Sequence, residues 1–366
     1  MEPLPRGANF QRALMLWEIG LHIAGNPNTP YYGPRDMCIA VGSGSNETFK
    51  PWLRMSTGSP ILAHAVCRNE LEAAMINPSG LLTQAYRGTG LFPEQLPVRI
   101  VAVYPSLDHF VYVIHPRTGL KSLAEIKERK YPLRLSIRED ATHSTRVLVD
   151  QTLTAYGMTI KDIESWGGSL QLNGGPSDER RMKAIREGTI DAIFDEGLVL
   201  WLNDALESGM QPITLDDFAF KRLVDLGWRK YTIKPGRYKN LKQVHTCIDY
   251  SGWPLYTCAS LPDDDAYKIC DAIMARKEQI YWEDSYTGVG QLGENTDATP
   301  ARRAASSGRR EMVPRARIQS LSIPGFIFRH GLAANHLATT RIHRTPLHPW
   351  SVSKFCGCNS LRKQSG

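Results

Sequence analysis

Residues 169–197, SLQLNGGPSDERRMKAIREGTIDAIFDEG, decide the fold class of this chain. An apolar run comes first, then a polar loop with two glycines, a segment of helical character and a second apolar run. This order predicts two strands joined by a helix, the unit from which parallel sheets with helical cover are built. The second strand, Ile190–Phe194, would carry Asp195 and Glu196 at its carboxyl end.

The same alternation extends from this unit in both directions. Further strands are expected at 37–41, 98–104 and 110–115, with two more inside 246–260. Helices are expected within 59–75, after Ser122 with Glu125 completing a capping box, at 144–156 and at 261–280. An amphipathic N-terminal helix is expected because apolar residues recur at helical spacing, namely Leu14, Trp17, Leu21 and Ala24. We therefore predict an α/β fold with mostly parallel sheets.

Length and composition bound the class of protein. At 366 residues the chain is long enough for two domains. Its hydrophobic content is 42%, and no apolar run approaches the ~20 residues of a membrane-spanning helix. The seven cysteines are scattered, apart from Cys356 and Cys358, which predicts buried thiols rather than a disulfide framework, zinc site or redox centre. No metal and no cofactor are expected.

The net charge of +7 comes from one segment. From Thr299 to the end of the chain there are 12 basic residues and one acidic residue, so this segment carries +11. Residues 1–298 hold 32 basic and 36 acidic residues and carry −4. The body is therefore mildly acidic, and nucleic acid is excluded as a partner.

Four loops of small polar residues each follow an apolar run and precede a helix. They are 42–45, 56–59, 77–80 and 142–145. Helix N-termini present unpaired N–H groups and the positive end of the helix dipole, and both attract anionic ligands. In an open α/β sheet such loops converge where the strands end, and small molecules bind there. The candidate ligand-binding residues are Ser43, Ser45, Asn77, Ser79, Ser144 and Thr145, together with Tyr104, Trp166 and Glu196.

Catalytic motifs are missing from the sequence. The chain has no G-x-S-x-G, HExxH or Walker-type sequence. Asp195 and Glu196 are neighbours at a strand end, so their side chains are expected on opposite faces, where they cannot act as an acid–base pair. His143 precedes Ser144, but neighbouring side chains at a helix start diverge, and this histidine is expected to be solvated. We predict no catalytic residues and a protein that binds a small molecule.

Five segments, in this order, resemble the TAXI family of solute receptors for TRAP-type transporters, which is close to the NMT1-like proteins. They are IAVGSGS (39–45), STGSPILAHAV (56–66), HPRTGLKSLAEIKERKYPLRLSI (115–137), HSTRVLVDQTLTAYG (143–157) and DERRMKAIREGTIDAIFDEG (178–197). The resemblance covers residues 38–300. It implies a two-lobed type II periplasmic binding protein-like fold whose lobes close on a ligand.

The resemblance also assigns parts of the chain. Residues 1–35 would be an N-terminal helix and linker, 36–114 plus 245–300 lobe one, and 115–244 lobe two. The implied ligand is a small carboxylate, the implied partner is a TRAP-type membrane permease, and the implied location is periplasmic. No signal peptide is recognisable at the N-terminus, so a cytoplasmic location is expected if the chain starts here.

Two alternative functions stay open. An enzyme on the same fold, like the pyrimidine-forming relatives of the NMT1-like proteins, would turn its ligand over. A cytosolic sensor would report the same ligand to a protein partner instead of a permease.

Residues 301–366 are interpreted as a frameshifted end. TAXI relatives close with a segment resembling P-L-D-V-P-L-H-P-G-A-E-x-W-Y-x-E, and ARRAASSGRREMVPRA (301–316) can be back-translated so that reading one base later encodes LDVPLHPGAEKWYRE. Met312 and Val313 require ATGGTN, which forces Trp in the shifted frame, and Glu311 forces Lys or Arg before it. We infer one inserted base near Pro300 and predict a disordered tail, because a strongly basic segment with few apolar positions buries too little surface.

Overall fold

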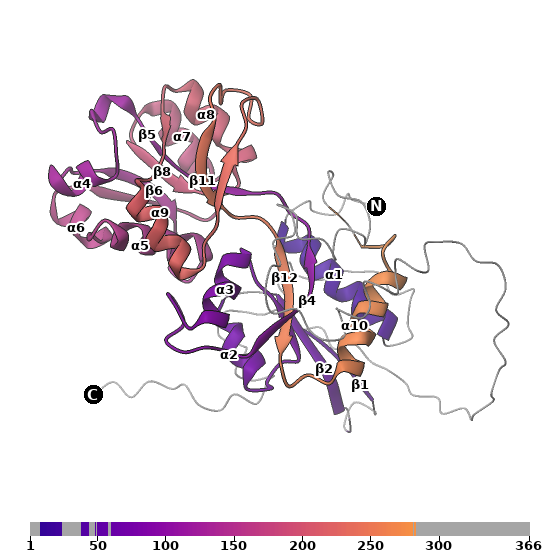
Figure 1. The fold of residues 1–366 in the computed structure, drawn as a ribbon. Helices are drawn as coiled ribbons and strands as arrows, with labels where there is room; N and C mark the ends of the chain where they lie inside the picture. Colours follow the sequence, from indigo (N-terminus) through magenta and orange to yellow (C-terminus); the bar gives the residue numbers. More distant parts are fainter. Residues whose placement is uncertain are drawn as a thin grey trace, which may run out of the picture. The chain divides into compact units, whose positions relative to one another are not determined.

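The computed structural model describes residues 8–23, 38–43, 48, 50–57, 60–280 and 282. The chain divides into two compact units (Figure 1). The first unit takes the residues up to Ile76, Leu96–Pro105 and those from Trp253 onward, and the second takes Asn77–Gln95 and Ser106–Gly252. Every helix among the described residues is too short or too polar to cross a membrane. The tail that the sequence predicts to be disordered lies outside the described residues.

The described residues of the first unit form a five-stranded sheet with three helices. In sheet order its strands are β1 (Cys38–Ser43), β2 (Lys50–Thr57), β3 (Ala73–Met75), β12 (Trp253–Cys258) and β4 (Val98–Tyr104). Its helices are α1 (Ala8–Ile23), α2 (Leu62–Cys67) and α10 (Asp263–Ala275). Only β2 and β3 are parallel. β12 lies between β3 and β4 in the sheet but follows all strands of the second unit in the sequence.

Helix α1 is buried on all sides rather than on one face. The residues from Arg12 to Leu21 are buried, and many of them share a core with α10 and the sheet. The expectation of an amphipathic helix is therefore wrong. Its polar residues tolerate burial because they are paired: the Arg12 guanidinium lies over the Trp253 ring, and Glu18 accepts hydrogen bonds from Arg276 Nε (2.9 Å) and Nη2 (2.6 Å).

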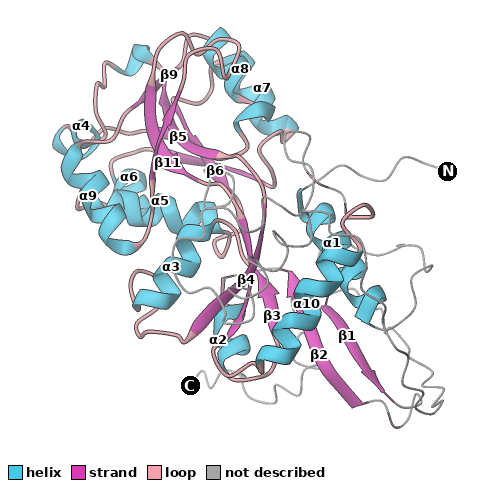
Figure 2. Ribbon diagram, turned by 45° about the vertical axis from the view of Figure 1, so that its right-hand side comes forward, coloured by secondary structure: helices cyan, strands magenta, loops and turns pink. Residues whose placement is uncertain are grey.

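The second unit is a seven-stranded sheet covered by helices (Figure 2). Its strands run in the order β10 (Lys230–Ile233), β11 (His245–Asp249), β5 (His109–Ile114), β8 (Ala192–Asp195), β6 (Arg134–Arg138) and β7 (Ser169–Asn173), with β9 (Gln211–Ile213) also paired to β5. Its helices are α3 (Ser79–Arg87), α4 (Ala124–Glu128), α5 (Ser144–Ala155), α6 (Ile160–Ser165), α7 (Glu179–Glu187), α8 (Leu202–Glu207) and α9 (Asp217–Leu226), with 3-10 turns η1 (Pro116–Thr118) and η2 (Leu198–Leu200). Every residue of β5 is buried, which explains its unbroken apolar run.

The α/β fold in two units is confirmed, but the sheets are mixed rather than mostly parallel. In the second sheet only β6 is parallel to its neighbours, β7 and β8. Apart from β1–β2, the antiparallel pairs involve β5 and β11 here and β12 in the first sheet. β5, β11 and β12 lie next to the points at which the chain passes from one unit to the other. Their direction is therefore set by this passage, and not by a helix that brings the chain back to start a parallel strand.

The crossings do not fall at the predicted lobe boundaries, residues 114 and 245. β5 and β11 both pair within the second sheet, so the chain changes unit between Pro105 and Ser106 and again between Gly252 and Trp253. The segment Asn77–Gln95, which contains α3, also groups with the second unit.

Most predicted elements are present, with two local corrections. The helix expected within 59–75 ends at Cys67, because Asn69 adopts a left-handed conformation (φ 59°) and the chain turns into β3. Ser122 does not cap a helix: α4 begins only at Ala124, and Leu123 occupies the cap position without a side-chain bond. The Glu125 carboxylate instead accepts from the N–H of Lys121 (3.2 Å).

Candidate ligand-binding site

One edge of the second sheet gathers polar residues from five strands. The parallel strands β6, β7 and β8 end there at Arg138, Asn173 and Asp195. β5, antiparallel to β8, begins at this edge just after Asp108. β11, antiparallel to β5, ends there at Asp249. We call this the carboxyl edge, because it is the end of an α/β sheet at which ligands bind.

An ion network occupies the middle of the carboxyl edge. Arg138 Nε donates to both carboxylate oxygens of Asp195 (2.9 and 2.8 Å), and Arg138 Nη2 donates to Glu196. Arg181 Nη1 donates to Asp195 Oδ2 (2.5 Å), and neither of these two side chains is exposed. Burial alone would raise the pKa of Asp195, but the two guanidinium groups outweigh it and hold this pKa below its ordinary value.

The prediction that the side chains of Asp195 and Glu196 point to opposite faces is therefore wrong. Strand β8 ends at Asp195, so the alternation of side chains no longer applies to Glu196. Gly197 then adopts a left-handed conformation (φ 66°) and turns the chain. Both carboxylates consequently bind the same guanidinium, that of Arg138.

Asp108 adds a third carboxyl group next to the network. Its carboxylate oxygens accept from the N–H groups of His109 (2.7 Å) and Gly197 (3.2 Å). Burial, followed by the charge of Glu196 and a hydrogen bond to it, raises the pKa of Asp108 well above its usual value. In the ion network itself, the two guanidinium groups of Arg138 and Arg181 are matched by the two carboxyl groups of Asp195 and Glu196.

Helix α5 begins at the same edge. His143 occupies its N-cap, and His143 Nδ1 accepts from the N–H of Thr145 (3.2 Å) and contacts Thr145 Oγ1 (2.9 Å). Ser144 Oγ bonds with the hydroxyl of Tyr250, which is buried. Burial and the positive charge of Arg138 lower the pKa of His143. His143 is therefore a structural cap rather than the solvated loop histidine that was expected.

Helix α3 is tied to the carboxyl edge through the segment 250–252. Ser79 Oγ donates to the carbonyl of Ser251 (3.4 Å), and Asn77 Nδ2 donates to that of Tyr250 (3.4 Å). The Ser251 hydroxyl donates to the Asp108 carbonyl (2.9 Å) and accepts from the Asp108 N–H (3.0 Å). The starts of two helices and of β5 are thereby held around one short segment.

The buried polar atoms without a hydrogen-bond partner among the described residues include Arg181 Nη2 and Asn173 Oδ1 at this edge. Both side chains are fully buried and both donate to the Ser136 hydroxyl, from Arg181 Nε (3.0 Å) and Asn173 Nδ2 (2.8 Å). Leaving one such atom unsatisfied costs about 1–3 kcal/mol. The edge therefore keeps donor and acceptor capacity for a further polar group.

The structure brings together five of the nine predicted site residues. Asn77, Ser79, Ser144, Thr145 and Glu196 all lie at the carboxyl edge. Ser43 and Tyr104 belong to the first unit, where Tyr104 is buried against Trp282. Ser45 lies outside the described residues. Trp166 follows α6 and precedes β7, so it lies at the opposite edge of the second sheet.

Sequence reasoning missed Arg138, Arg181, Asp108 and Tyr250. A weak signal existed for Arg138, since a charged residue at the end of a buried strand must find a partner. Arg146 donates from Nη1 to the Arg138 carbonyl (2.9 Å) and so runs back along the end of β6.

Among the described residues, no group of three or more His, Cys, Asp or Glu side chains could hold a metal ion. A sequence model of the NMT1-like family matches residues 53–301. This chain belongs to the NMT1-like family. No curated protein matches it in sequence.

Solved structures with a similar fold are distant. The periplasmic binding protein BugD is 11% identical, with 87% of this chain and 94% of that chain covered and a TM-score of 0.38. A glycine betaine/L-proline-binding protein (ProX) from Borrelia burgdorferi is 9% identical, with 77% and 95% covered and a TM-score of 0.35. Lactococcal OpuAC, complexed with glycine betaine, is 9% identical, with 85% and 94% covered and a TM-score of 0.35. The family assignment rests on the sequence model alone.

Proposed function

We propose that this NMT1-like protein is a solute-binding protein that captures a small carboxylate, or a similar polar metabolite, at the carboxyl edge of the second sheet. The observation that carries the proposal is the convergence of two helix starts on Tyr250–Gly252, next to a buried and charge-balanced ion network. Groups held by so many mutual bonds are pre-ordered, which reduces the entropy that binding must overcome.

The chemistry of the edge favours a carboxylate. Arg138 and Arg181 are balanced by Asp195 and Glu196, so the network supplies little net charge. Attraction for an anion then comes from the positive ends of α5 and α3, with hydroxyl groups such as that of Ser144 as donors. Placement in the TAXI group, with delivery to a TRAP-type permease in the periplasm, is part of this proposal and is supported by the five sequence segments quoted above.

A thermal-shift screen of the full chain tests the proposal. The panel holds small mono- and dicarboxylates, including glutamate, with the corresponding amides and with glycine betaine as comparison ligands. A ligand that binds only the folded state raises the melting temperature in a concentration-dependent way. We expect one or more carboxylates to do so and their amides to do so less.

Variants then locate the binding site. Ser144→Ala and Tyr250→Phe each remove one hydroxyl at the carboxyl edge, and affinity should fall about tenfold for a lost hydrogen bond to a charged group. Ser165→Ala removes a hydroxyl from the end of α6 and serves as the matched control. Affinities that change equally in all three variants, or a panel without any binder, would reject this site.

An enzyme is the second candidate, and Asp108 is the observation that favours it. A carboxyl group with a raised pKa beside a second carboxyl group, that of Glu196, is an arrangement that can donate and accept protons. Incubation of each binding ligand with the protein, followed by mass spectrometry, separates the two candidates. Catalysed loss of a ligand that Asp108→Asn abolishes without loss of binding would establish the enzyme.

A further inference from the structure

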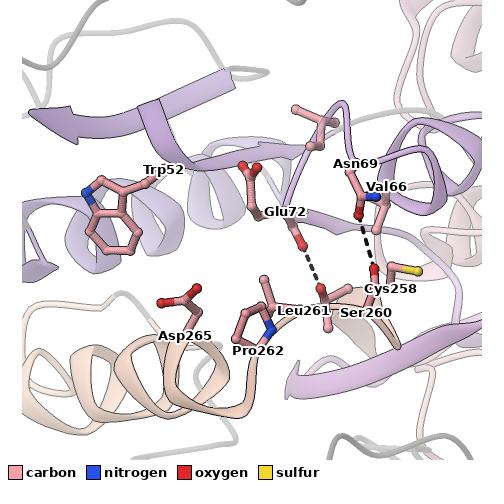
Figure 3. Close-up of a pocket in the computed structure, with 11 residues that line it drawn as sticks. Trp52, Val66, Asn69, Glu72, Cys258, Ser260, Leu261, Pro262 and Asp265 are labelled. Atoms are coloured by element: carbon pink, nitrogen blue, oxygen red, sulfur yellow. Dashed lines mark hydrogen bonds between the residues drawn. The ribbon is translucent and has the colours of Figure 1, made fainter. Parts of the chain in front are cut away.

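A pocket of about 210 Å³ lies within the first unit (Figure 3). Trp52 of β2 and Glu72, which precedes β3, contribute to its lining, as do Cys258 at the end of β12 and Asp265 in the first turn of α10. The carboxylates are already engaged, Glu72 with Arg54 Nη2 (2.6 Å) and Asp265 with Lys268 Nζ (2.7 Å). The reactive group left in the wall of the pocket is the thiol of Cys258.

Cys258 has a second cysteine as its immediate neighbour. Cys67 is the last residue of α2, Cys258 is the last residue of β12, and the two elements pack together. Each of the two cysteines affects the pKa of the other, raising that of Cys67 and lowering that of Cys258. Cys67 is partly exposed, whereas Cys258 is 7% exposed and is one of the residues that line the pocket. The fold therefore brings together two thiols that are 191 positions apart in the sequence.

The two thiols differ in their ease of ionisation. Burial raises the pKa of Cys67 to about 12, and the neighbouring Cys258 adds to this effect. Burial also acts to raise the pKa of Cys258, but hydrogen bonds from the side chain and N–H of Ser260 and from Cys67 outweigh it and lower this pKa. Ser260 Oγ also lies 3.1 Å from Asn69 Oδ1, so its single proton serves one of the two acceptors at a time. Of the two cysteines, Cys258 therefore has the lowered pKa and Cys67 the raised pKa.

We propose that Cys67 and Cys258 form a dithiol site that reacts with hydroperoxides entering the pocket of the first unit, with Cys258 as the attacking thiol and Cys67 as the resolving thiol. The site is independent of the ligand site at the carboxyl edge. It differs from the buried, inert thiols that the scattered cysteines predicted, because two cysteines on packed elements, one of them lining an open pocket, have both a reaction partner and a path for the oxidant.

The reaction balances with one hydroperoxide, ROOH, as the oxidant. The Cys258 thiolate attacks the terminal oxygen, an S–O bond forms, the O–O bond breaks, and the alkoxide leaves and takes up a proton as ROH. The Cys67 sulfur then attacks the Cys258 sulfur, an S–S bond forms and the S–O bond breaks. The departing hydroxide takes the proton of Cys67 and leaves as water. The two sulfurs lose two electrons together, and the peroxide gains them.

The experiment treats the full-length protein with hydrogen peroxide, followed by alkylation, tryptic digestion and mass spectrometry. Cys67 lies alone in the tryptic peptide 55–68, and Cys258 shares the peptide 243–268 with Cys247. We expect these two peptides to become linked, with a mass 2 Da below their sum because two hydrogens are lost. Cys247→Ser should leave the link intact, since Cys247 is buried in the second unit.

Two further variants separate the roles of the two cysteines. Cys67→Ser should stop the reaction at the sulfenic acid of Cys258, which dimedone traps. Cys258→Ser should leave Cys67 unmodified at the same peroxide dose. Peroxide-treated wild-type protein without the linked peptide, or dimedone trapped equally at Cys67 and Cys258, would overturn the proposal.

Discussion

Two ion pairs, one in each unit of this protein, differ in how deeply they are buried. In the first unit the ion pair Arg54–Glu72 stays partly open to water, with side-chain exposures of 26% and 17%. In the second unit Arg181 and Asp195 are both at 0%. An ion pair in partial contact with water is worth little, whereas a buried pair balances a large desolvation cost against a large attraction.

The difference indicates that the second unit buries charged groups that add little to its free energy of unfolding. Buried ion pairs often stabilise no more than apolar residues of the same volume would. The network of Arg138, Arg181, Asp195 and Glu196 nevertheless lies at the sheet edge where small molecules bind in α/β proteins. We interpret it as a frame that fixes the orientation of this edge, which the core of the first unit does not need.

The change that affects the most residues is expected from the reading frame at Pro300, and it concerns the first unit. The family model ends at residue 301, the position at which the sequence predicts an inserted base. We expect the gene, resequenced, to encode LDVPLHPGAEKWYRE in the frame that follows one base later. We further expect the restored chain to melt several degrees higher, since about 1 kcal/mol corresponds to roughly 2–4 °C in a protein of this size.

A nucleotide sequence whose second frame lacks this segment would contradict the inference. A matched chain that ends at Pro300 shows whether a higher melting temperature comes from the restored segment or only from removal of the basic tail. If it melts at the same temperature as the restored chain, removal of the basic tail accounts for the gain and the segment itself adds nothing.

The largest effect of a single substitution on the free energy of unfolding is expected from breaking a buried ion pair. The comparison takes one ion pair from each unit. Asp195→Ala leaves Arg181 buried without its carboxylate and should lower the free energy of unfolding by about 3–5 kcal/mol. Glu72→Ala breaks the matched pair in the first unit and should cost about 1 kcal/mol or less. Urea unfolding followed by fluorescence and circular dichroism measures both values. Equal losses would mean that the burial of the network has no energetic consequence.

Two buried histidines of the second unit make its stability depend on pH. Burial lowers the pKa of His245 to about 4, and burial with the charge of Arg237 lowers that of His109 to about 3. Between pH 6.5 and these values the unfolded chain binds protons that the folded chain does not, so stability falls as the pH falls. Each histidine contributes about 1.4 kcal/mol per pH unit in this window.

The variant His245→Gln isolates one of these contributions. Asp108 acts in the opposite direction, because its raised pKa makes the folded state bind a proton, but this effect is common to both proteins and cancels in their difference. From pH 6 to pH 5 the wild type should therefore lose about 1.4 kcal/mol more than the variant. Unfolding free energies that run parallel for the two proteins would show that His245 is protonated in the fold.

The elements were predictable from the sequence where a local pattern sets them. The periodicity of 144–156 gave α5, and the apolar run 98–104 gave β4. The strand directions were not predictable, because β5, β11 and β12 obtain theirs from the crossings between units. The local pattern of apolar and polar residues does not indicate where the chain passes from one unit to the other.

The candidate site was predictable only in its loops. Ser79 and Ser144 were found because small polar residues before a helix are a local signal. Their partners were not, since Arg138 meets Asp195 across 57 positions and Ser144 meets Tyr250 across 106. Glu196 was misjudged because strand alternation was extended one residue beyond the end of β8.

The smallest effect is expected for Trp166, and it compares the two edges of the second sheet. Trp166 was predicted to contact the ligand, but it precedes β7, whose first residue pairs with the first residue of β6 at the edge opposite Asp195. Trp166→Phe should therefore change the affinity for a carboxylate that binds in the thermal-shift panel by no more than about twofold, the effect of an ordinary surface substitution. Tyr250→Phe, at the carboxyl edge, should lower the same affinity about tenfold because it removes the hydroxyl that bonds Ser144. Isothermal titration with one carboxylate and both variants makes the comparison, and a loss with Trp166→Phe that matched the loss with Tyr250→Phe would move the site away from the carboxyl edge.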